Sequence, residues 1–219
     1  MVVRNTTKAL CVLLFLLLAA SAASQGKIKP WTQWNQRDAE KILNDSAWSQ
    51  EIVQATSVIL RVRFLSAKPI RQALLRLMEL RPSETSPDQI RLAREFVDRK
   101  FENSIIVAVS YEMYKNTSSA ALGPYFQAFS SAITSSLKNN TYLQVKDARV
   151  FLEEYQPPTH DGLGARFVFP RHDVEKLLTN PKNDWLRFYA DWPAMTGMQL
   201  TINARFRVAN FLYEGSLEY

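Results

Sequence analysis

An unbroken alternation of apolar and polar residues runs through the chain from Met198 to Val208. Its apolar members are Met198, Leu200, Ile202, Ala204, Phe206 and Val208, and its polar members are Gln199, Thr201, Asn203, Arg205 and Arg207. Because successive side chains of a β-strand point to opposite faces, this pattern predicts a strand with one buried face and one solvated face. Helical periodicity does not produce such a pattern, so the chain must build a sheet against a core.

Two further stretches predict strands. Between Ser57 and Leu65 the apolar positions alternate with Arg61 and Arg63, which repeats the arrangement of the 198–208 segment. The segment from Ile105 to Tyr111 is apolar on both faces, as is typical of a central strand that is covered on both sides. The sheet therefore has at least one strand in its interior and two strands with a solvated face.

Apolar residues at helical spacing predict helices between the strands. One begins near Pro69, and another begins at the capping signal Ser86-Pro87-Asp88-Gln89. The spacing i, i+3, i+4, i+7 predicts a helix over residues 183–192, with a stripe formed by Trp185, Phe188, Tyr189 and Trp192. Such a stripe is either the buried face of a helix or, where exposed, a surface that stacks sugars or a peptide.

The remaining pattern sets the fold class. Tyr142 to Tyr155 predicts one long strand that bends near Asp147, and Ala165 to Phe169 predicts a strand that returns. The strands and helices do not alternate as regular βαβ units. We therefore expect an α+β fold, with a mixed, mostly antiparallel sheet of about five or six strands and helices packed on it.

The first 23 residues have the features of a secretory signal peptide. Arg4 and Lys8 precede an apolar run from Ala9 to Ala20, and small residues follow, so cleavage is expected after Ala22 or Ala23. The alternative is a membrane anchor, but the run is shorter than the roughly 20 residues that a spanning helix needs. The whole chain has 27 Lys+Arg and 21 Asp+Glu, and the leader carries two basic residues and no acidic one. The surplus of positive charge in the mature chain is therefore four, which permits attraction to an acidic surface without requiring it.

Cysteine usage and length bound the domain organisation. Cys11 is the only cysteine and lies within the apolar run, so the mature chain has no disulfide, thiol nucleophile or cysteine metal ligand. A chain of this size can rest on a hydrophobic core alone. We expect a signal peptide over 1–23, a tryptophan-rich arm and helix over 24–54, and a single α+β domain over 55–219.

Three segments of the chain carry distinctive local motifs. The first has Lys29-Pro-Trp-Thr-x-Trp34, then Asp38, then Leu43-Asn-Asp-Ser-x-Trp48. The others are Phe167-Val-Phe-Pro-Arg171 and the segment from Phe206 to Tyr219 with its Tyr-Glu-Gly turn. Together they resemble a family of secreted bacterial proteins of no known activity. The resemblance implies bacterial export, and it carries over no catalytic residue.

Catalytic groups are few. His160-Asp161 lies in a Pro/Gly-rich loop over 156–164, where a histidine beside an aspartate can act as base and orienter, although an exposed turn is the commoner role. His172, Asp173 and Glu175 can be combined with His160 as metal ligands, yet acids in a first helical turn are expected from the helix dipole alone. No glycine-rich phosphate loop is present. The sequence therefore predicts no catalytic residue, no metal site and no cofactor.

Arginines and tryptophans supply the candidate binding residues. Arg61, Arg63, Arg205 and Arg207 occupy the polar faces of two strands, and Lys146 and Arg149 lie on a third. If these strands are neighbours with the same face exposed, their side chains form a basic patch for an acidic polymer or a lipid head group. Ordinary pairing with acids, or packing of the arginine stems beneath helices, is the alternative. Trp31 and Trp34 of the arm are a second candidate binding surface if they are exposed, where they can stack sugars or a peptide. The alternative is that these tryptophans pack onto the domain.

The sequence thus predicts an exported bacterial domain, secreted or periplasmic, that binds a partner without catalysis or belongs to the cell envelope. The partner is left open between an acidic polymer, an envelope component and another protein. Nucleic acid is not expected, and neither is a membrane-spanning segment once the leader is removed. The alternative is a hydrolase that uses His160 and Asp161.

Overall fold

The computed structural model describes residues 29–54, 58–114, 118–195 and 198–219, with backbone alone at 193–195 and 198–199. The chain divides into two units, Met1–Gln33 and Trp34–Tyr219. In the first unit, the described part holds the short 3₁₀ helix η2 (Trp31–Gln33). The predicted signal peptide lies outside the described residues. The second unit begins at Trp34, and the predicted boundary between 54 and 55 stays a prediction.

The second unit is built from helices and strands together, which confirms the predicted α+β class. Its α-helices are α2 (Gln36–Asn44), α3 (Lys68–Leu80), α4 (Pro87–Asp98), α5 (Gly123–Ser131), α6 (Thr134–Leu137) and α7 (Arg171–Leu177), with 3₁₀ helices η3 (Ser119–Leu122) and η4 (Val208–Phe211). Its strands are β1 (Ser49–Gln54), β2 (Val58–Phe64), β3 (Ser104–Met113), β4 (Thr141–Val145), β5 (Ala148–Phe151), β6 (Glu154–Gln156), β7 (Ala165–Pro170), β8 (Trp185–Met195), β9 (Met198–Arg207), β10 (Leu212–Tyr213) and β11 (Ser216–Leu217).

The strands form two main sheets rather than the one sheet that we expected. A five-stranded sheet has the order β1-β2-β3-β7-β6, and a four-stranded sheet has the order β5-β4-β8-β9. A small hairpin, β10-β11, follows. Every pairing between the described strands is antiparallel.

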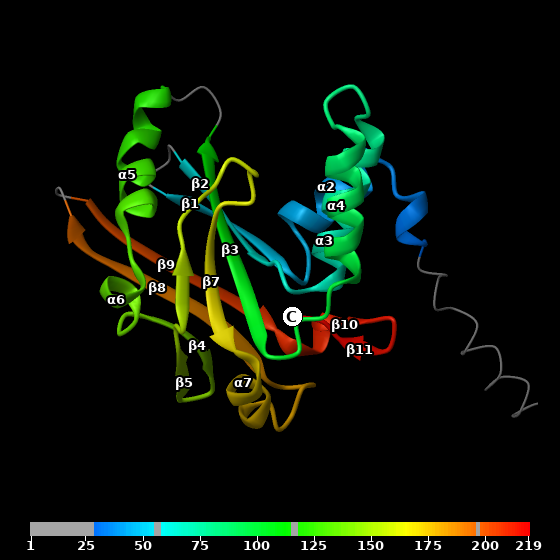
Figure 1. The fold of residues 1–219 in the computed structure, drawn as a ribbon. Helices are drawn as coiled ribbons and strands as arrows, with labels where there is room; N and C mark the ends of the chain where they lie inside the picture. Colours follow the sequence, from blue (N-terminus) through cyan, green and yellow to red (C-terminus); the bar gives the residue numbers. More distant parts are fainter. Residues whose placement is uncertain (1–28, 55–57, 115–117, 196–197) are drawn as a thin grey trace, which may run out of the picture. The chain divides into compact units, whose positions relative to one another are not determined.

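The two sheets face each other across an aromatic core. Phe64 of β2 meets Phe206 of β9 with ring centroids 4.9 Å apart, and Phe167 of β7 meets Phe188 of β8 at 5.2 Å. Helices α2, α3 and α4 lie on the opposite side of the five-stranded sheet (Figure 1). The second unit therefore has three layers: the four-stranded sheet, the five-stranded sheet, and the helices α2, α3 and α4.

The sheets are also joined along both edges. On one side the chain passes from β5 to β6, where Leu152 N–H donates to Thr141 of one sheet and Glu153 N–H donates to Val168 of the other. On the other side, side chains of β1 reach the backbone of β9. Gln50 Oε1 accepts from Arg205 N–H at 3.2 Å, and its amide nitrogen donates to the Arg205 carbonyl. Gln54 donates to the Thr201 carbonyl at 3.2 Å.

The strands and helices with clear periodicity lie where the sequence predicts them. The alternation at 198–208 forms β9, with Ile202, Ala204 and Phe206 buried. The signal at Ser86 is a complete capping box, in which Ser86 Oγ accepts from Gln89 N–H and the Gln89 side chain accepts from Ser86 N–H. Both predictions, the strand at 198–208 and the helix start at Ser86, are therefore confirmed.

The helix predicted over 183–192 is wrong, because this segment is strand β8. The residues buried on its inner side are Leu186, Phe188, Ala190 and Trp192, and Trp185, Arg187, Tyr189 and Asp191 alternate with them on the outer side. The aromatic rings therefore do not share one face. Because Trp185 and Tyr189 on the outer side are aromatic rather than polar, the alternation that is typical of a strand was not evident in the sequence.

The long strand predicted over Tyr142–Tyr155 is also wrong as a single element. Lys146 adopts a positive φ of 54° and turns the chain, so that β5 folds back antiparallel on β4. After Phe151 the chain leaves the four-stranded sheet and pairs as β6 with β7. A tight turn and a change of sheet together replace the bend that we expected near Asp147.

Truncation of Phe206 tests the core between the sheets. Phe206 is 2% exposed and contacts Phe64 and Phe211, so Phe206→Ala removes a buried ring from the centre of the sandwich. We expect a loss of about 3–5 kcal/mol in the free energy of unfolding, measured by urea titration. Leu212→Ala is the control, because Leu212 is 61% exposed, and we expect a change within about 0.5 kcal/mol. A similarly small change for Phe206→Ala would contradict the packing.

Two buried tyrosines predict a loss of stability at alkaline pH. Burial, aided by Glu214 and Glu218, raises the pKa of Tyr213 to about 12, and burial with Glu175 raises the pKa of Tyr219 to about 12. The unfolded chain ionises its tyrosines near pH 10. The two protonated tyrosines therefore contribute fully to the free energy of unfolding below about pH 10, and this contribution is lost as the pH rises through about 12. We expect the urea midpoint to fall over this interval, and to fall less steeply in a Tyr213→Phe, Tyr219→Phe variant; an equal slope would contradict the assignment.

Candidate functional site

The two predicted arginine pairs lie on different sheets. Arg61 and Arg63 project from β2 in the five-stranded sheet, on the side of helix α2, whereas Arg205 and Arg207 project from the outer side of β9 in the four-stranded sheet. The structure therefore does not bring the four side chains onto one face. Of the residues on the third predicted strand, Arg149 lies on β5 in the same sheet as Arg205 and Arg207.

Arg61 and Arg63 are engaged within the fold. Arg61 forms ion pairs with Glu51 and Glu112 on the two neighbouring strands. Arg63 donates to the Leu43 carbonyl at 2.7 Å and to Ser110 Oγ at 2.9 Å. Burial, with a contribution from Arg61, lowers the pKa of Arg63 to about 10. Because the Leu43 carbonyl lies in the last turn of α2, Arg63 supplies a donor to a group that the helix itself leaves unsatisfied.

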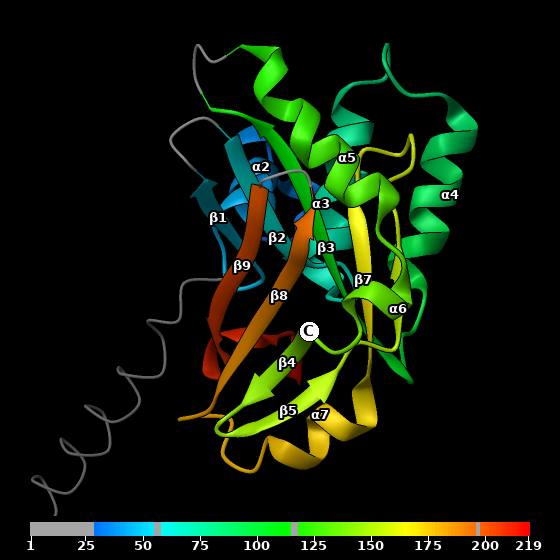
Figure 2. The same cartoon turned by 90° about the vertical axis from the view of Figure 1, so that its left-hand side faces the viewer.

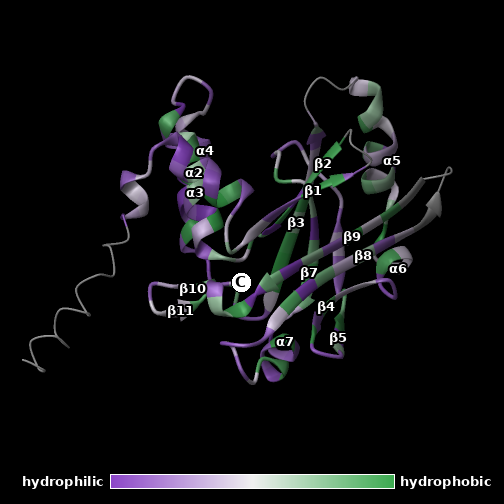
Figure 3. Ribbon diagram, turned by 180° about the vertical axis from the view of Figure 1, so that it is seen from behind, coloured by the Kyte–Doolittle hydropathy of each residue, from purple (hydrophilic) through white to green (hydrophobic). Residues whose placement is uncertain are grey.

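The outer side of the four-stranded sheet carries a second, different set of arginines. No helix lies over β8 and β9 when this side faces the viewer (Figure 2). Hydrophilic and hydrophobic segments alternate along these strands (Figure 3), in agreement with one buried and one exposed side. We call this surface the arginine face and define it by Arg149, Arg187, Arg205, Arg207, Tyr142, Trp185 and Tyr189.

Strand register places the arginines in rows. Arg149 of β5 lies opposite Gln144 of β4, Gln144 lies opposite Arg187 of β8, and Arg187 lies opposite Arg205 of β9. Neighbouring strands are about 4.8 Å apart, so this row spans about 14 Å across the sheet. Arg207 lies in the next row, opposite Trp185.

Aromatic rings support the guanidinium groups. The guanidinium carbon of Arg205 lies 4.5 Å from the Trp185 ring centroid, and that of Arg149 lies 4.6 Å from the Tyr142 ring centroid. Arg187 lies 5.7 Å from the ring of Tyr189. Cation–π attraction holds such side chains in few conformations and leaves their N–H groups free to donate. The arginine face is therefore a preorganised array of donors.

Acidic partners are scarce on this surface. In the part of the chain that the structure describes, none of Arg149, Arg187, Arg205 and Arg207 forms an ion pair. The nearby Asp184 is buried and pairs with Lys146 at 3.4 Å, and Asp191 accepts a hydrogen bond from the Thr201 hydroxyl at 2.7 Å. The arginines thus create a local excess of positive charge.

A hollow of 800 Å³ opens at one end of the arginine face. The residues that line it are Arg187, Arg205, Trp185, Gln144, Asn180, Asn183 and Asn203, together with the ion pair of Lys146 and Asp184. Arg187 Nε donates to Asn203 Oδ1 at 2.7 Å, which fixes the orientation of both side chains. Positive charge and carboxamide groups are therefore combined in one concave site.

His160 and Asp161 lie elsewhere, in a groove of 1190 Å³ lined by α3, α4 and the five-stranded sheet. Asp161 accepts from Leu163 N–H at 3.0 Å and pairs with Arg166. Burial raises the pKa of Asp161, but these contacts and Thr159 outweigh burial and hold the pKa below its ordinary value. Among the described hydrogen bonds, none joins Asp161 to His160, so a hydrolase mechanism that uses both stays a prediction.

The other predicted candidates are placed as follows. Asp173 of α7 pairs with Lys176, and Glu175 pairs with Arg171. Within the described ranges, no group of three or more His, Cys, Asp or Glu side chains is arranged to hold a metal ion. Trp31 belongs to the first unit, whereas Trp34 belongs to the second and is 7% exposed.

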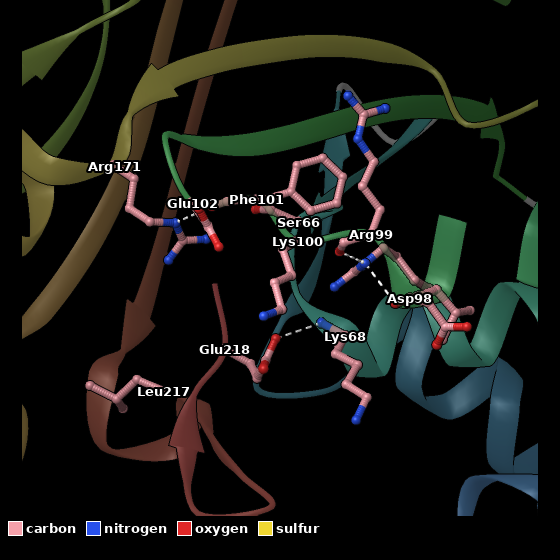
Figure 4. Close-up of a pocket in the computed structure, with 12 residues that line it drawn as sticks. Ser66, Lys68, Asp98, Arg99, Lys100, Phe101, Glu102, Arg171, Leu217 and Glu218 are labelled. Carbon is pink, nitrogen blue, oxygen red and sulfur yellow. Dashed lines mark hydrogen bonds between the residues drawn. The ribbon is translucent and has the colours of Figure 1, made fainter. Parts of the chain in front are cut away.

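A second charged hollow, of 460 Å³, lies between the end of α4 and the start of α3 (Figure 4). Arg71 lines it and donates from one nitrogen to the carbonyls of Phe96 and Val97 at 2.8 Å, and to that of Arg99. Burial lowers the pKa of Arg71 to about 10. The Glu218 carboxylate accepts from Lys68 N–H at 2.9 Å and so caps α3. The principal charges of this hollow therefore serve the fold.

The sequence did not reveal Arg187 and Trp185 as part of the site, because the wrong helix prediction covered them. The alternation of Leu186, Phe188 and Ala190 with polar or aromatic residues was the signal that identifies this strand.

Comparison of the chain with models of protein families, with curated proteins and with solved structures finds no match. Among the described residues, no helix has the length and apolar character needed to cross a membrane.

Replacing one arginine of each pair distinguishes their roles. Arg63→Met removes the donor to Leu43 and leaves a half-buried carbonyl unsatisfied, so we expect a loss of about 2–3 kcal/mol in the free energy of unfolding. Arg205→Met removes no ion pair with a described residue, and we expect a change within about 0.5 kcal/mol in the free energy of unfolding. Urea titrations of the two variants make the comparison. Equal destabilisation would show that the two pairs have the same structural role.

Proposed function

We propose that this chain is an exported bacterial domain that binds an anionic partner on the arginine face and carries out no catalysis. The observation that carries the proposal is the set of four arginines, Arg149, Arg187, Arg205 and Arg207, each of which lies beside an aromatic ring, Arg207 at 5.8 Å from the Trp185 ring centroid. Among the residues that the structure describes, no acid forms an ion pair with any of the four. The leader-like segment 1–23 supports export, because its charge, apolar run and small residues are those of a secretory signal peptide.

The energetics favour binding over a purely structural role for these side chains. An arginine paired with a carboxylate has already satisfied much of its capacity to donate, as Arg61 does with Glu51 and Glu112. Arg205 and Arg207 keep that capacity available on an exposed strand. Guanidinium groups bind carboxylate, phosphate and sulfate groups through paired hydrogen bonds, and a row of them suits a ligand with repeated negative charges.

Charge reversal tests the proposal. An Arg205→Glu, Arg207→Glu variant places two carboxylates on the arginine face, and we expect at least about a tenfold loss of affinity for heparin, a highly anionic probe, by isothermal titration calorimetry. Binding by the unmodified chain should weaken as salt is raised, because exposed charges are screened. The matched control is Arg37→Glu, Lys41→Glu, which makes the same change in net charge on the exposed surface of α2.

The control separates a local site from a general charge effect. The control variant should retain the affinity of the unmodified chain. If both variants weaken binding equally, net charge rather than the arginine face accounts for it. If the arginine variant binds heparin unchanged, or the unmodified chain does not bind it, the proposed site is incorrect.

A further inference from the structure

The hollow at the end of the arginine face has a hydrogen-bonding character that phosphate or sulfate binding alone does not require. We call it the carboxamide hollow, after Gln144, Asn180, Asn183 and Asn203, which line it with Arg187, Arg205 and Trp185. Its lining also includes Lys146 and Asp184, but Asp184 is buried and its carboxylate is paired with Lys146 at 3.4 Å. Carboxamides are uncharged and each combines a carbonyl acceptor with an amino donor. Four of them beside two guanidinium groups present a mixture of donors, acceptors and positive charge.

The existing hydrogen bonds show which of these groups are available to a ligand. Gln144 uses its amino group to donate to the Lys146 carbonyl at 2.8 Å, which leaves its carbonyl oxygen as an acceptor. Asn203 uses its carbonyl oxygen to accept from Arg187, which leaves its amino group as a donor. Within the described part of the chain, the side chains of Asn180 and Asn183 make no hydrogen bond, so both of their groups remain available.

A ligand that satisfies this site must both donate and accept. Phosphodiesters, polyphosphates and sulfates offer only acceptors along their charged backbone, so they leave the carbonyl oxygens of Gln144, Asn180 and Asn183 without donors. Sugar hydroxyl groups donate and accept, and a carboxylate on the same sugar ring pairs with a guanidinium group in the bidentate manner. Arg187 and Arg205 lie directly opposite each other on neighbouring strands, next to the carboxamides.

We infer that the carboxamide hollow binds a uronic acid residue of an acidic polysaccharide, an inference that rests on the proposed function of the arginine face. The carboxylate of the sugar pairs with Arg187 and Arg205, and its hydroxyl groups bond to the surrounding carboxamides. Arg149 lies two strands from Arg187 in the same row, so a carboxylate farther along the polymer reaches it. The polysaccharide crosses the strands of the sheet rather than following them.

Single-stranded nucleic acid fits this surface less well. Its recognition on sheets depends on aromatic rings that offer free faces to the bases. Here Arg205 covers Trp185 at 4.5 Å, and Tyr142 and Tyr189 stack on each other with centroids 4.9 Å apart. The rings therefore support arginines and neighbouring rings instead of presenting an open stacking platform.

Matched probes test the assignment on the full chain. Oligogalacturonate supplies both carboxylates and hydroxyl groups, its methyl ester keeps the hydroxyl groups without charge, and polyphosphate of equal charge supplies charge without hydroxyl groups. Oligo-dT supplies a nucleic acid. By isothermal titration calorimetry we expect oligogalacturonate to bind at least about tenfold more tightly than each of the other three.

A carboxamide variant provides the second measurement. Asn180→Ala, Asn183→Ala removes two side chains that make no hydrogen bond to any residue that the structure describes. We expect about a tenfold loss of affinity for oligogalacturonate with unchanged affinity for polyphosphate. Asn103→Ala, Gln127→Ala is the matched control, because both of its residues are exposed and neither lines the hollow. The control should bind like the unmodified chain, and melting temperatures of both variants check that they fold.

Failure of this inference differs from failure of the proposed function. If polyphosphate or oligo-dT binds as tightly as oligogalacturonate, or the carboxamide variant weakens all probes equally, the uronic acid assignment is overturned while the arginine face remains an anion-binding surface. If none of the charged probes binds, the proposed function itself is overturned. Tight binding of the methyl ester would also overturn the assignment, because charge would then not contribute.

Discussion

Packing of aromatic rings between the two sheets is the constraint on which the rest of the structure depends. Phe206 of β9 packs on Phe64, and Phe188 of β8 packs on Phe167. Because side chains alternate along a strand, burial of these rings forces their neighbours in sequence to the other side. A slip of one residue in β9 would bury its arginines and expose Phe206. The core therefore determines which residues make up the arginine face.

The chain uses the same local sequence, Arg-x-Arg on a strand, in two different ways. In β2 the neighbouring strands supply Glu51 and Glu112 as ion-pair partners for Arg61. Helix α2 supplies the Leu43 carbonyl as an acceptor for Arg63. Both guanidinium groups therefore bind other parts of the fold. In β9 the corresponding position has Trp185 as its neighbour, which attracts a guanidinium without neutralising its charge. What differs is not the motif but the residues that tertiary structure places beside it.

Elements with a local sequence pattern could be predicted, whereas the neighbours that tertiary structure supplies could not. Strand β9 and the start of α4 follow from local patterns, alternation in one case and a capping box in the other, and both are confirmed. Strand β8 was mistaken for a helix because its outer side carries Trp185 and Tyr189. These large aromatic residues are usually buried, and with Phe188 and Trp192 they fall at helical spacing. The division into two sheets, and hence the separation of Arg61 from Arg205, depends on long-range pairing that no local pattern encodes.

The contact of Gln50 and Gln54 with β9 has a consequence for the behaviour of the molecule in concentrated solution. An outermost strand with free N–H and C=O groups is a template on which another chain can add a strand, and this leads to aggregation. At Arg205 the carboxamide of Gln50 occupies both the backbone donor and the backbone acceptor, as an intruding strand would. Gln54 occupies a further acceptor at Thr201. Two glutamines thus occupy backbone groups at the edge of a sheet whose outer face carries exposed arginines.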